Sequence, residues 1–283
     1  MMRSLGELGV DVKTLEMPEG LIIVQLGDLV RVADSPDLDS LSCVQTADRL
    51  MHVNPGRWIQ ILGNHDTALI GGPRRATWRP PEADDARALA AADIIHGWWR
   101  SGRCRMAHGL FTVEYGPTLL THGGLTRMRW RAIGSHRDPR SAADCLNEDV
   151  SRPPSDVFFA GLLVNEGAGV GDPDVTWAEV GSELYDPWIV SNDMPFTQIH
   201  GHASPWNWQT NAWWPSVSDE VISATEVQHV TRRTQTRVPG PSVGEARVFV
   251  STDWNLGETP TDSIWPLLHI TEQSSPILRI NST

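Results

Sequence analysis

The stretch Ile61-Leu62-Gly63-Asn64-His65-Asp66 passes from apolar residues through a glycine to three polar side chains. Residues 57–62 are mostly residues that favour a β-strand, and the glycine is a typical strand end. Because open α/β sheets bind ligands at the carboxyl ends of their strands, this order predicts that Asn64, His65 and Asp66 project from such an edge. Amide, imidazole and carboxylate groups all bind metal ions. The stretch therefore predicts a strand that leads directly into a functional site.

Three other stretches repeat this pattern of an apolar run followed by a metal-binding residue type beside glycine. They cover residues 21–28, 119–124 and 196–202, and they supply Asp28, His122 and His202. A single aspartate after a strand glycine is more often a turn residue, and an isolated histidine is more often structural. Four such stretches in one chain predict that their polar groups meet at a metal site.

The apolar spacing predicts an alternation of strands and helices. A strand over 21–26, a helix over 41–51 and a strand over 57–62 form a strand–helix–strand unit, which implies a mainly parallel local sheet. Further expected elements are a helix over 86–100, a hairpin of strands at 110–114 and 117–121, a helix at 127–132, a helical region over 138–170 and a strand over 247–251. The fold class expected is α/β.

Length and composition limit the classes of protein that the chain can represent. The chain has 283 residues, 40% of them hydrophobic, which is enough for one large core, so a single domain over residues 1–283 is expected. No run approaches the roughly 18 apolar residues of a membrane helix. The formal net charge of −12 argues against binding of long nucleic acids, which needs a basic face.

The cysteines and the start of the sequence favour a cytoplasmic location. The three cysteines are widely spaced, so neither a disulfide framework nor a zinc knuckle is indicated, and the first residues lack the apolar core of a signal peptide. Tryptophan is unusually frequent, with 13 residues and a cluster within 206–214. Packing is the first interpretation of this cluster, and a stacking platform for a base or another ring is the alternative.

Four motifs, taken in order, carry a resemblance to a known family. Gly27-Asp28, Gly63-Asn64-His65-Asp66, His122-Gly123-Gly124 and Gly201-His202 resemble the later signature motifs of the calcineurin-like metallophosphoesterase superfamily. The similarity is to the branch of bacterial serine/threonine-type phosphatases and diadenosine tetraphosphatases, and it covers roughly residues 20–255. It implies a four-layer α/β/β/α sandwich of two mixed sheets, in which hydroxide attacks a phosphate held at a dinuclear metal site.

The resemblance also implies roles for single residues. Asp28 corresponds to the carboxylate that bridges two divalent ions of the Mn, Fe or Zn type. His65 is similar to the catalytic histidine, which stabilises the transition state or protonates the leaving alkoxide, and Asp66 would orient it from behind. The remaining ligands of the second metal are Asn64, His122 and His202.

The chain departs from the family pattern in two places. The first family motif, an Asp-x-His at the end of the first strand, is not found, so that strand is apparently missing and one of the two metal sites is complete. In the motif after Gly27, Arg31 and Val32 stand where the family has aspartate and arginine. Arg31 is a candidate replacement for the phosphate-binding arginine. Arg127 could also grip a phosphate, although its series with Arg129 and Arg131 fits a solvated helix face equally well.

Three functional interpretations follow from this pattern. The first is a metallophosphatase, acting on a phosphorylated small molecule, a nucleotide or a phosphoprotein, whose sequence is truncated at the N-terminus. The second is a catalytically impaired relative that binds one metal or a phosphorylated ligand. The third is an interaction protein that uses its tryptophan-rich region. No membrane partner is expected.

Overall fold

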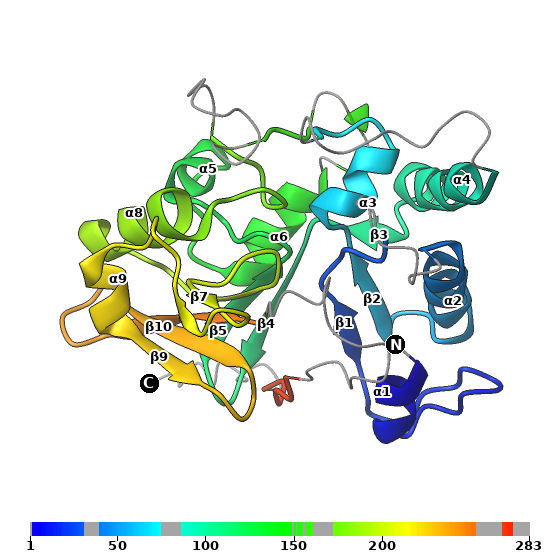
Figure 1. Cartoon of the computed structure of the whole chain (residues 1–283), viewed down its shortest axis with the longest axis horizontal. Helices are drawn as coiled ribbons and strands as arrows, with labels where there is room; N and C mark the ends of the chain where they lie inside the picture. The colour runs from blue at the N-terminus through cyan, green and yellow to red at the C-terminus, as the bar shows by residue number, and fades with distance from the viewer. Residues whose placement is uncertain are drawn as a thin grey trace, which may run out of the picture.

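The computed structural model describes residues 2–30, 40–74, 86–148, 150, 152–154, 157–160, 172–252 and 268–273. Within this part of the chain, helices surround a three-stranded sheet, a six-stranded sheet and a two-stranded hairpin (Figure 1). The predicted α/β class is confirmed. None of the helices in these ranges is long and apolar enough to span a membrane. The single domain and the cytoplasmic location stay predictions.

The small sheet contains the strand of the Gly-Asn-His-Asp motif and is parallel throughout. Its order is β1 (Ile23–Gln25), β2 (Trp58–Ile61) and β3 (Cys104–Arg105). Two helices precede β2 and β3, namely α2 (Ser40–Val53) and α4 (Ala86–Ser101). They pack against each other on the side of the small sheet that faces away from the large sheet (Figure 1). The predicted strand–helix–strand unit and its parallel pairing are therefore confirmed.

The large sheet is mixed and contains the strands that precede the two candidate histidine ligands. Its order is β4 (Ala107–Thr112), β5 (Gly116–Thr121), β6 (Thr197–His200), β11 (Ala246–Ser251), β10 (Arg233–Pro239) and β9 (Thr225–Gln228). β5, β6 and β11 run parallel, whereas the β4–β5, β11–β10 and β10–β9 pairs are antiparallel. β4 and β5 form the predicted hairpin around residues 113–115.

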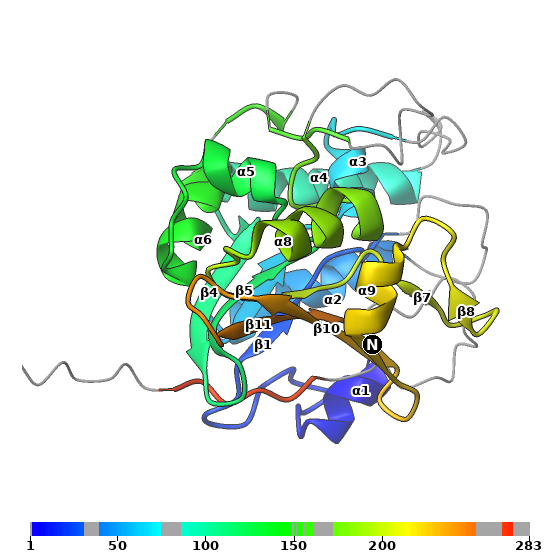
Figure 2. The ribbon, with the colours of Figure 1, turned by 90° about the vertical axis from the view of Figure 1, so that its left-hand side faces the viewer.

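Short helices cover the large sheet. α6 (Pro139–Glu148) packs on β4 and β5, while α8 (Asp186–Ser191) and α9 (Asp219–Ala224) contact β10. Figure 2 shows α8 and α9 over the strands β10 and β11. The remaining elements are α1 (Met2–Glu7), α3 (Asn64–Leu69), α5 (Arg127–Ala132), the π-helix η3 (Val180–Tyr185), and the strands β7 (Trp206–Asn207) and β8 (Ala212–Trp213).

The helical region predicted over 138–170 is shorter than expected. The helix α6 ends at Glu148, and residues 152–154 and 157–160 contain no α-helix. Pro153 and Pro154 explain this end, because proline has no N–H to continue the helical hydrogen bonds and restricts the residue before it. The glycine-rich part of that prediction, residues 161–171, lies outside the described residues.

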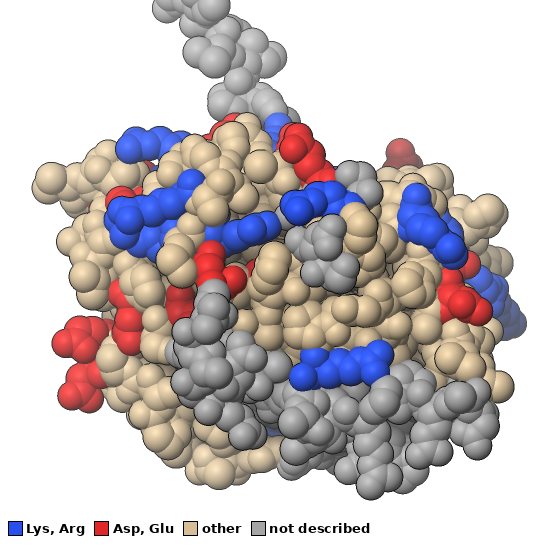
Figure 3. Space-filling model, turned by 90° about the horizontal axis from the view of Figure 1, so that it is seen from above, with Lys and Arg blue, Asp and Glu red and all other residues tan. Residues whose placement is uncertain are grey.

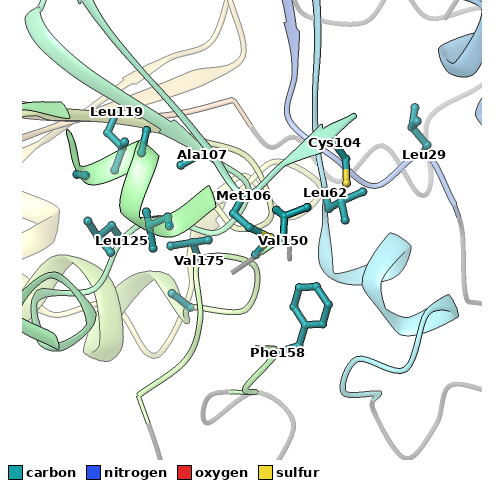
Figure 4. Packing of buried hydrophobic residues seen from close by; sticks show 14 of the residues in the cluster. Leu29, Leu62, Cys104, Met106, Ala107, Leu119, Leu125, Val150, Phe158 and Val175 are labelled. Carbon is teal, nitrogen blue, oxygen red and sulfur yellow. The ribbon is translucent and has the colours of Figure 1, made fainter. Parts of the chain in front are cut away.

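The two sheets share one small apolar cluster. Ile61 of β2 packs in it with residues of the large sheet, namely Leu110, Leu120, Ile199 and Val250. The chain passes from the small sheet to the large one at Met106, which lies between β3 and β4 and is 2% exposed. Figure 4 shows Met106 with Leu62 and Cys104 on one side and Ala107 on the other. The candidate site therefore stands on two sheets that one buried core connects.

Candidate metal centre

The loops after β1 and β2 are in direct contact, and their glycines make this contact possible. A Cβ atom on Gly63 would overlap the backbone nitrogen and Oδ1 of Asp28, and a Cβ on Gly27 would overlap the backbone of Gly63. Gly27 has a φ of 97° and Asp28 a φ of 58°, a conformation that is uncommon for a residue with a side chain. Such backbone strain concentrates at functional sites. The sequence Gly-Asp therefore fixes where the Asp28 carboxylate lies.

Asp66 ties these two loops together. Its Oδ2 accepts hydrogen bonds from the N–H groups of Gly63 at 2.9 Å and Asp28 at 2.8 Å, and its Oδ1 accepts one from Val30 at 3.1 Å. The side chain is fully buried, and burial together with the nearby charge of Asp28 raises the pKa of Asp66 to about 7. These three contacts show Asp66 bracing the backbone around Asp28, and its role in orienting His65 stays a prediction.

His122 brings the large sheet to the ends of β1 and β2. It follows β5, and its side chain is 3% exposed. Its Nδ1 lies 2.6 Å from the carbonyl oxygen of Leu26, its Nε2 lies 2.9 Å from Oδ1 of Asn64, and the same Nε2 lies 3.4 Å from Oδ1 of Asp28. Three of the four predicted ligands, Asp28, Asn64 and His122, therefore meet around one nitrogen atom.

The hydrogen bond to Leu26 determines the tautomer of His122. A carbonyl oxygen can only accept, so Nδ1 of His122 carries the proton, and in the neutral ring Nε2 presents its lone pair. That lone pair faces the oxygen atoms of Asn64 and Asp28. Contact between such acceptors is unfavourable unless the Asn64 amide is rotated, the ring is protonated, or a cation lies between them. Rotation of the amide would still leave the Asp28 carboxylate facing the lone pair.

His202 completes the group. It follows β6 and has a φ of 58°, again in the left-handed region. Its Nδ1 lies 3.1 Å from Oδ1 of Asn64, and the ring centroids of His202 and His122 are 5.1 Å apart. The edge of Trp177, which is fully buried, packs against the His202 ring with the centroids 5.9 Å apart. The four predicted ligands thus form a connected chain of contacts in which Asn64 is central.

The spacing of these atoms is compatible with one small cation. Ligand atoms placed about 2.0–2.2 Å from an ion lie about 3–3.5 Å from each other, depending on geometry. The three contacts given above, at 2.9, 3.1 and 3.4 Å, are in this range. Within the described residues, however, no three His, Cys, Asp or Glu side chains alone form a group that could hold a metal ion. This holds for Asp28, His122 and His202 too, so a site here would need both the Asn64 amide as a ligand and a closer approach of these three side chains.

His65 lies beside this group but is more accessible. Its backbone N–H donates to Oδ1 of Asp28 at 3.1 Å, and its Nε2 lies 3.9 Å from Oδ2 of the same carboxylate. The His65 side chain is 24% exposed. An imidazole next to a carboxylate and open to solvent can exchange protons with a bound molecule.

The two predicted phosphate-binding arginines have different outcomes. Arg31 lies outside the described residues. Arg127, in the predicted helix α5, donates from Nε at 3.0 Å and from Nη2 at 2.8 Å to the two oxygens of Asp193. The guanidinium of Arg127 is thus paired within the protein through Nε and Nη2, and its role with substrate stays a prediction.

The tryptophan cluster is a packed hairpin. Trp206 of β7 and Trp213 of β8 face each other edge to face with centroids 4.9 Å apart. His229 contacts the rings of Trp206 and Trp208 with centroids 5.8 and 6.0 Å away. These contacts support the packing interpretation, and the stacking platform stays a prediction.

Sequence reasoning missed the glutamines near the site. Gln25 and Gln60 stand side by side on β1 and β2, and Gln198 is fully buried on β6. A signal was present, because glutamine is unusual within an otherwise apolar buried strand.

Comparison with protein-family models, with curated proteins and with solved structures found no match to this chain. A function for this chain is therefore inferred from the site itself.

Proposed function

We propose that this protein is a metal-dependent phosphoester hydrolase that resembles the calcineurin-like metallophosphoesterases. One observation carries the proposal, which is that Nδ1 of His122 lies against the Leu26 carbonyl while its Nε2 lies against the oxygens of Asn64 and Asp28. A histidine whose other ring nitrogen donates to a backbone carbonyl is the usual arrangement of a metal-bound imidazole. A cation at this point would turn an unfavourable contact into a coordination site.

The residues that would hold the ion are Asp28, Asn64, His122 and His202. Their oxygen and imidazole donors suit Mn, Fe or Zn. When bound, such an ion supplies Lewis-acid polarisation of a phosphate and lowers the pKa of a water molecule. Asp28 lies at the outer side of the group, with its side chain 32% exposed, and so is the ligand best placed to reach a second ion.

His65 would act on the leaving group. It is held next to the ligand group by the hydrogen bond from its backbone N–H to Asp28. Its imidazole is the accessible member of the cluster, so it can hold a proton at Nε2 for a leaving oxygen.

The fold supports the same proposal. Helices α2 and α4 cover the small sheet, α6, α8 and α9 contact the large sheet, and an apolar cluster joins the two sheets. We propose that these parts form the four-layer α/β/β/α sandwich that the resemblance implies. In that arrangement the loops after β1, β2, β5 and β6 supply the site.

The class of ligand follows from the proposed chemistry. Figure 3 views the molecule from the side on which α3 and α5 lie, where Lys and Arg side chains are spread over the face with Asp and Glu side chains beside several of them. We propose a phosphorylated small molecule, a nucleotide or a phosphoprotein as the ligand.

The test is a titration with Mn²⁺ followed by calorimetry, together with hydrolysis of 4-nitrophenyl phosphate. Binding and turnover are expected for the wild type, and both are expected to be lost in His122→Ala. His96→Ala, which alters a partly buried histidine on α4, is the matched control and is expected to behave as wild type. A wild-type protein that binds no Mn²⁺ would refute the proposal.

A second function is favoured by one observation. Within the described residues, only one set of candidate ligands comes together, whereas the family chemistry uses two ions. This favours a catalytically impaired relative that binds a single ion or a phosphorylated ligand. One equivalent of Mn²⁺ without hydrolysis would support this function, and two equivalents with hydrolysis would support the first.

A further inference from the structure

Two glutamines hold backbone groups of the loops that carry candidate ligands. Oε1 of Gln25 accepts a hydrogen bond from the N–H of Gly27 at 2.7 Å, and its Nε2 donates to the carbonyl oxygen of Gly27 at 2.7 Å. Gln198 binds Leu125 in the same way, with an N–H donated to Oε1 at 2.7 Å and a carbonyl accepting from Nε2 at 3.1 Å. Each amide therefore pairs both polar groups of one residue.

Gly27 and Leu125, the two residues that the glutamines bind, adjoin the candidate metal centre. Gly27 directly precedes Asp28, and the two have φ values of 97° and 58°. Leu125 directly follows the turn His122-Gly123-Gly124, in which Gly124 has a φ of 89°. Left-handed backbone at a non-glycine residue, such as Asp28, is unfavourable and persists only when its surroundings fix it. The glutamine side chains are contacts that can do so.

Gln25 is itself held by a second glutamine. Nε2 of Gln60 donates to Oε1 of Gln25 and also to the carbonyl oxygen of Ile61 at 2.8 Å. Oε1 of Gln60 accepts from Nε1 of Trp58 at 3.3 Å. A buried amide destabilises a fold when it is unpaired, whereas a fully bonded network fixes one geometry. Gln25 and Gln60 each use both the oxygen and the nitrogen of the amide in these hydrogen bonds, as such a network requires.

We propose that Gln25 and Gln198 are positioning residues for the metal centre. They touch no reacting atom. By fixing the backbone at Gly27 and Leu125, they hold the Asp28 carboxylate and the His122 ring at the separation that a shared ion needs. The proposal rests on the metal-dependent function proposed above.

If Gln25 and Gln198 only stabilised the fold, their loss would lower the unfolding temperature and leave the Kd for Mn²⁺ unchanged. The chain offers a control for this possibility. Asn54 is fully buried, accepts from the N–H of Met17 at 2.9 Å and donates to the carbonyl oxygen of Leu15 at 2.7 Å. It lies just before β2, at the opposite end of the strand from Gly63. Asn54→Leu removes an amide with similar contacts away from the ligand loops.

The experiment measures the Kd for Mn²⁺ by calorimetry and thermal unfolding in parallel. Gln25→Met and Gln198→Met keep the side-chain shape and remove the amide. Loss of groups that orient metal ligands weakens metal binding by about 10–100-fold, and a rise of that size in Kd is expected for both variants. Asn54→Leu is expected to lower the unfolding temperature and leave the Kd at the wild-type value. Gln25→Asn, which keeps an amide on a shorter stem, serves if Gln25→Met does not fold, and a rise in Kd is expected for it as well.

The outcomes separate the two proposals. If the wild type binds Mn²⁺ and the glutamine variants bind it equally tightly, the positioning role is wrong while the metal site stands. Equal weakening by Asn54→Leu would also overturn the positioning role, because general destabilisation would then explain the effect. If the wild type itself binds no Mn²⁺, both proposals fail.

Discussion

His65, in the first turn of α3, and His200, at the end of β6, have opposite environments. His200 is 1% exposed, its Nε2 lies 2.8 Å from the hydroxyl of Tyr185, and burial lowers the pKa of His200 to about 4. His200 is therefore a neutral structural residue. His65, with a side chain that is 24% exposed, is the histidine that would exchange protons with a phosphoester in the proposed function.

This contrast leads to a prediction for His65→Ala. If His65 donates a proton to the leaving group, its loss lowers kcat by about 10²–10⁴-fold, the usual contribution of general acid catalysis. The Kd for Mn²⁺ should stay at the wild-type value, because His65 is not among the four ligands. Steady-state kinetics and calorimetry on the same preparation check both statements. Loss of Mn²⁺ binding in this variant would instead make His65 a ligand.

At the scale of the elements, the contact between the loops after β1 and β2 predicts opposite effects for two glycines. Gly63→Ala would drive a methyl group into the backbone and carboxylate of Asp28, so we expect a loss of about 1–3 kcal/mol in the free energy of unfolding. Gly97 lies within α4 and has open space at its Cβ position. Gly97→Ala is expected to stabilise the protein by about 0.5–1 kcal/mol.

Denaturation in urea measures both free energies. The sign of the effect is the test, since glycine-to-alanine substitution is the same chemical change in both variants. A Gly63→Ala protein as stable as the wild type would show that the two loops can separate at no cost.

Asp66 gives a second prediction at this scale, because it joins the loop after β1 to the first turn of α3. Asp66→Ala leaves the N–H groups of Gly63, Asp28 and Val30 without their acceptor. Each buried donor left unpaired costs about 1–3 kcal/mol, so the expected loss in the free energy of unfolding is about 3 kcal/mol or more. Asp93→Ala, at an exposed position of α4, should change stability by less than about 0.5 kcal/mol. Equal effects in urea denaturation would contradict the bracing role.

At the scale of the whole molecule, the features that the sequence predicted are those with local causes. The strand ends at Gly27 and Gly63 were recognisable because a glycine ends an apolar run there. The convergence of Asp28, Asn64, His122 and His202 was predicted from the repetition of this local pattern. Contacts between segments that are distant in the sequence produce no such local pattern. The pairing of Arg127 with Asp193 depends on two residues that only the fold brings together.

Two other features show the same limit. The end of α6 at Glu148 depends on the prolines that follow, and the apolar spacing beyond them gave the wrong length. The hydrogen bonds of Asp66 depend on where the chain turns after β1, because that turn places the backbone N–H groups of Asp28 and Val30 at its carboxylate. A spacing pattern identifies residue types for a site, whereas their contacts depend on packing between sheets.

Asp174 links the global stability to pH, because it is buried where residues 157–160 and 172–177 meet. Its Oδ2 accepts from the N–H of Phe159 at 2.7 Å, and its Oδ1 accepts from the N–H of Thr176 at 2.6 Å. Burial raises the pKa of Asp174 from 3.8 to about 6, against the opposite effect of these hydrogen bonds. The folded protein therefore keeps this proton to a higher pH than the unfolded chain does, and unfolding releases it between about pH 4 and pH 6.

The contribution of Asp174 to the free energy of unfolding should consequently fall as the pH rises through this window, by about 3 kcal/mol for a pKa difference of two units. Asp66, whose pKa is raised to about 7, acts in the same direction, whereas His200, whose pKa is lowered to about 4, acts in the opposite one, so the contribution of Asp174 must be isolated. Asp174→Asn does so, because the amide does not titrate. Urea denaturation at several pH values between 4 and 7 should show that the stability of the wild type relative to this variant falls as the pH rises. Identical slopes would mean that Asp174 loses its proton at the same pH in the folded protein and in the unfolded chain, and that its burial is relieved by water or by a rearrangement of the segments around it.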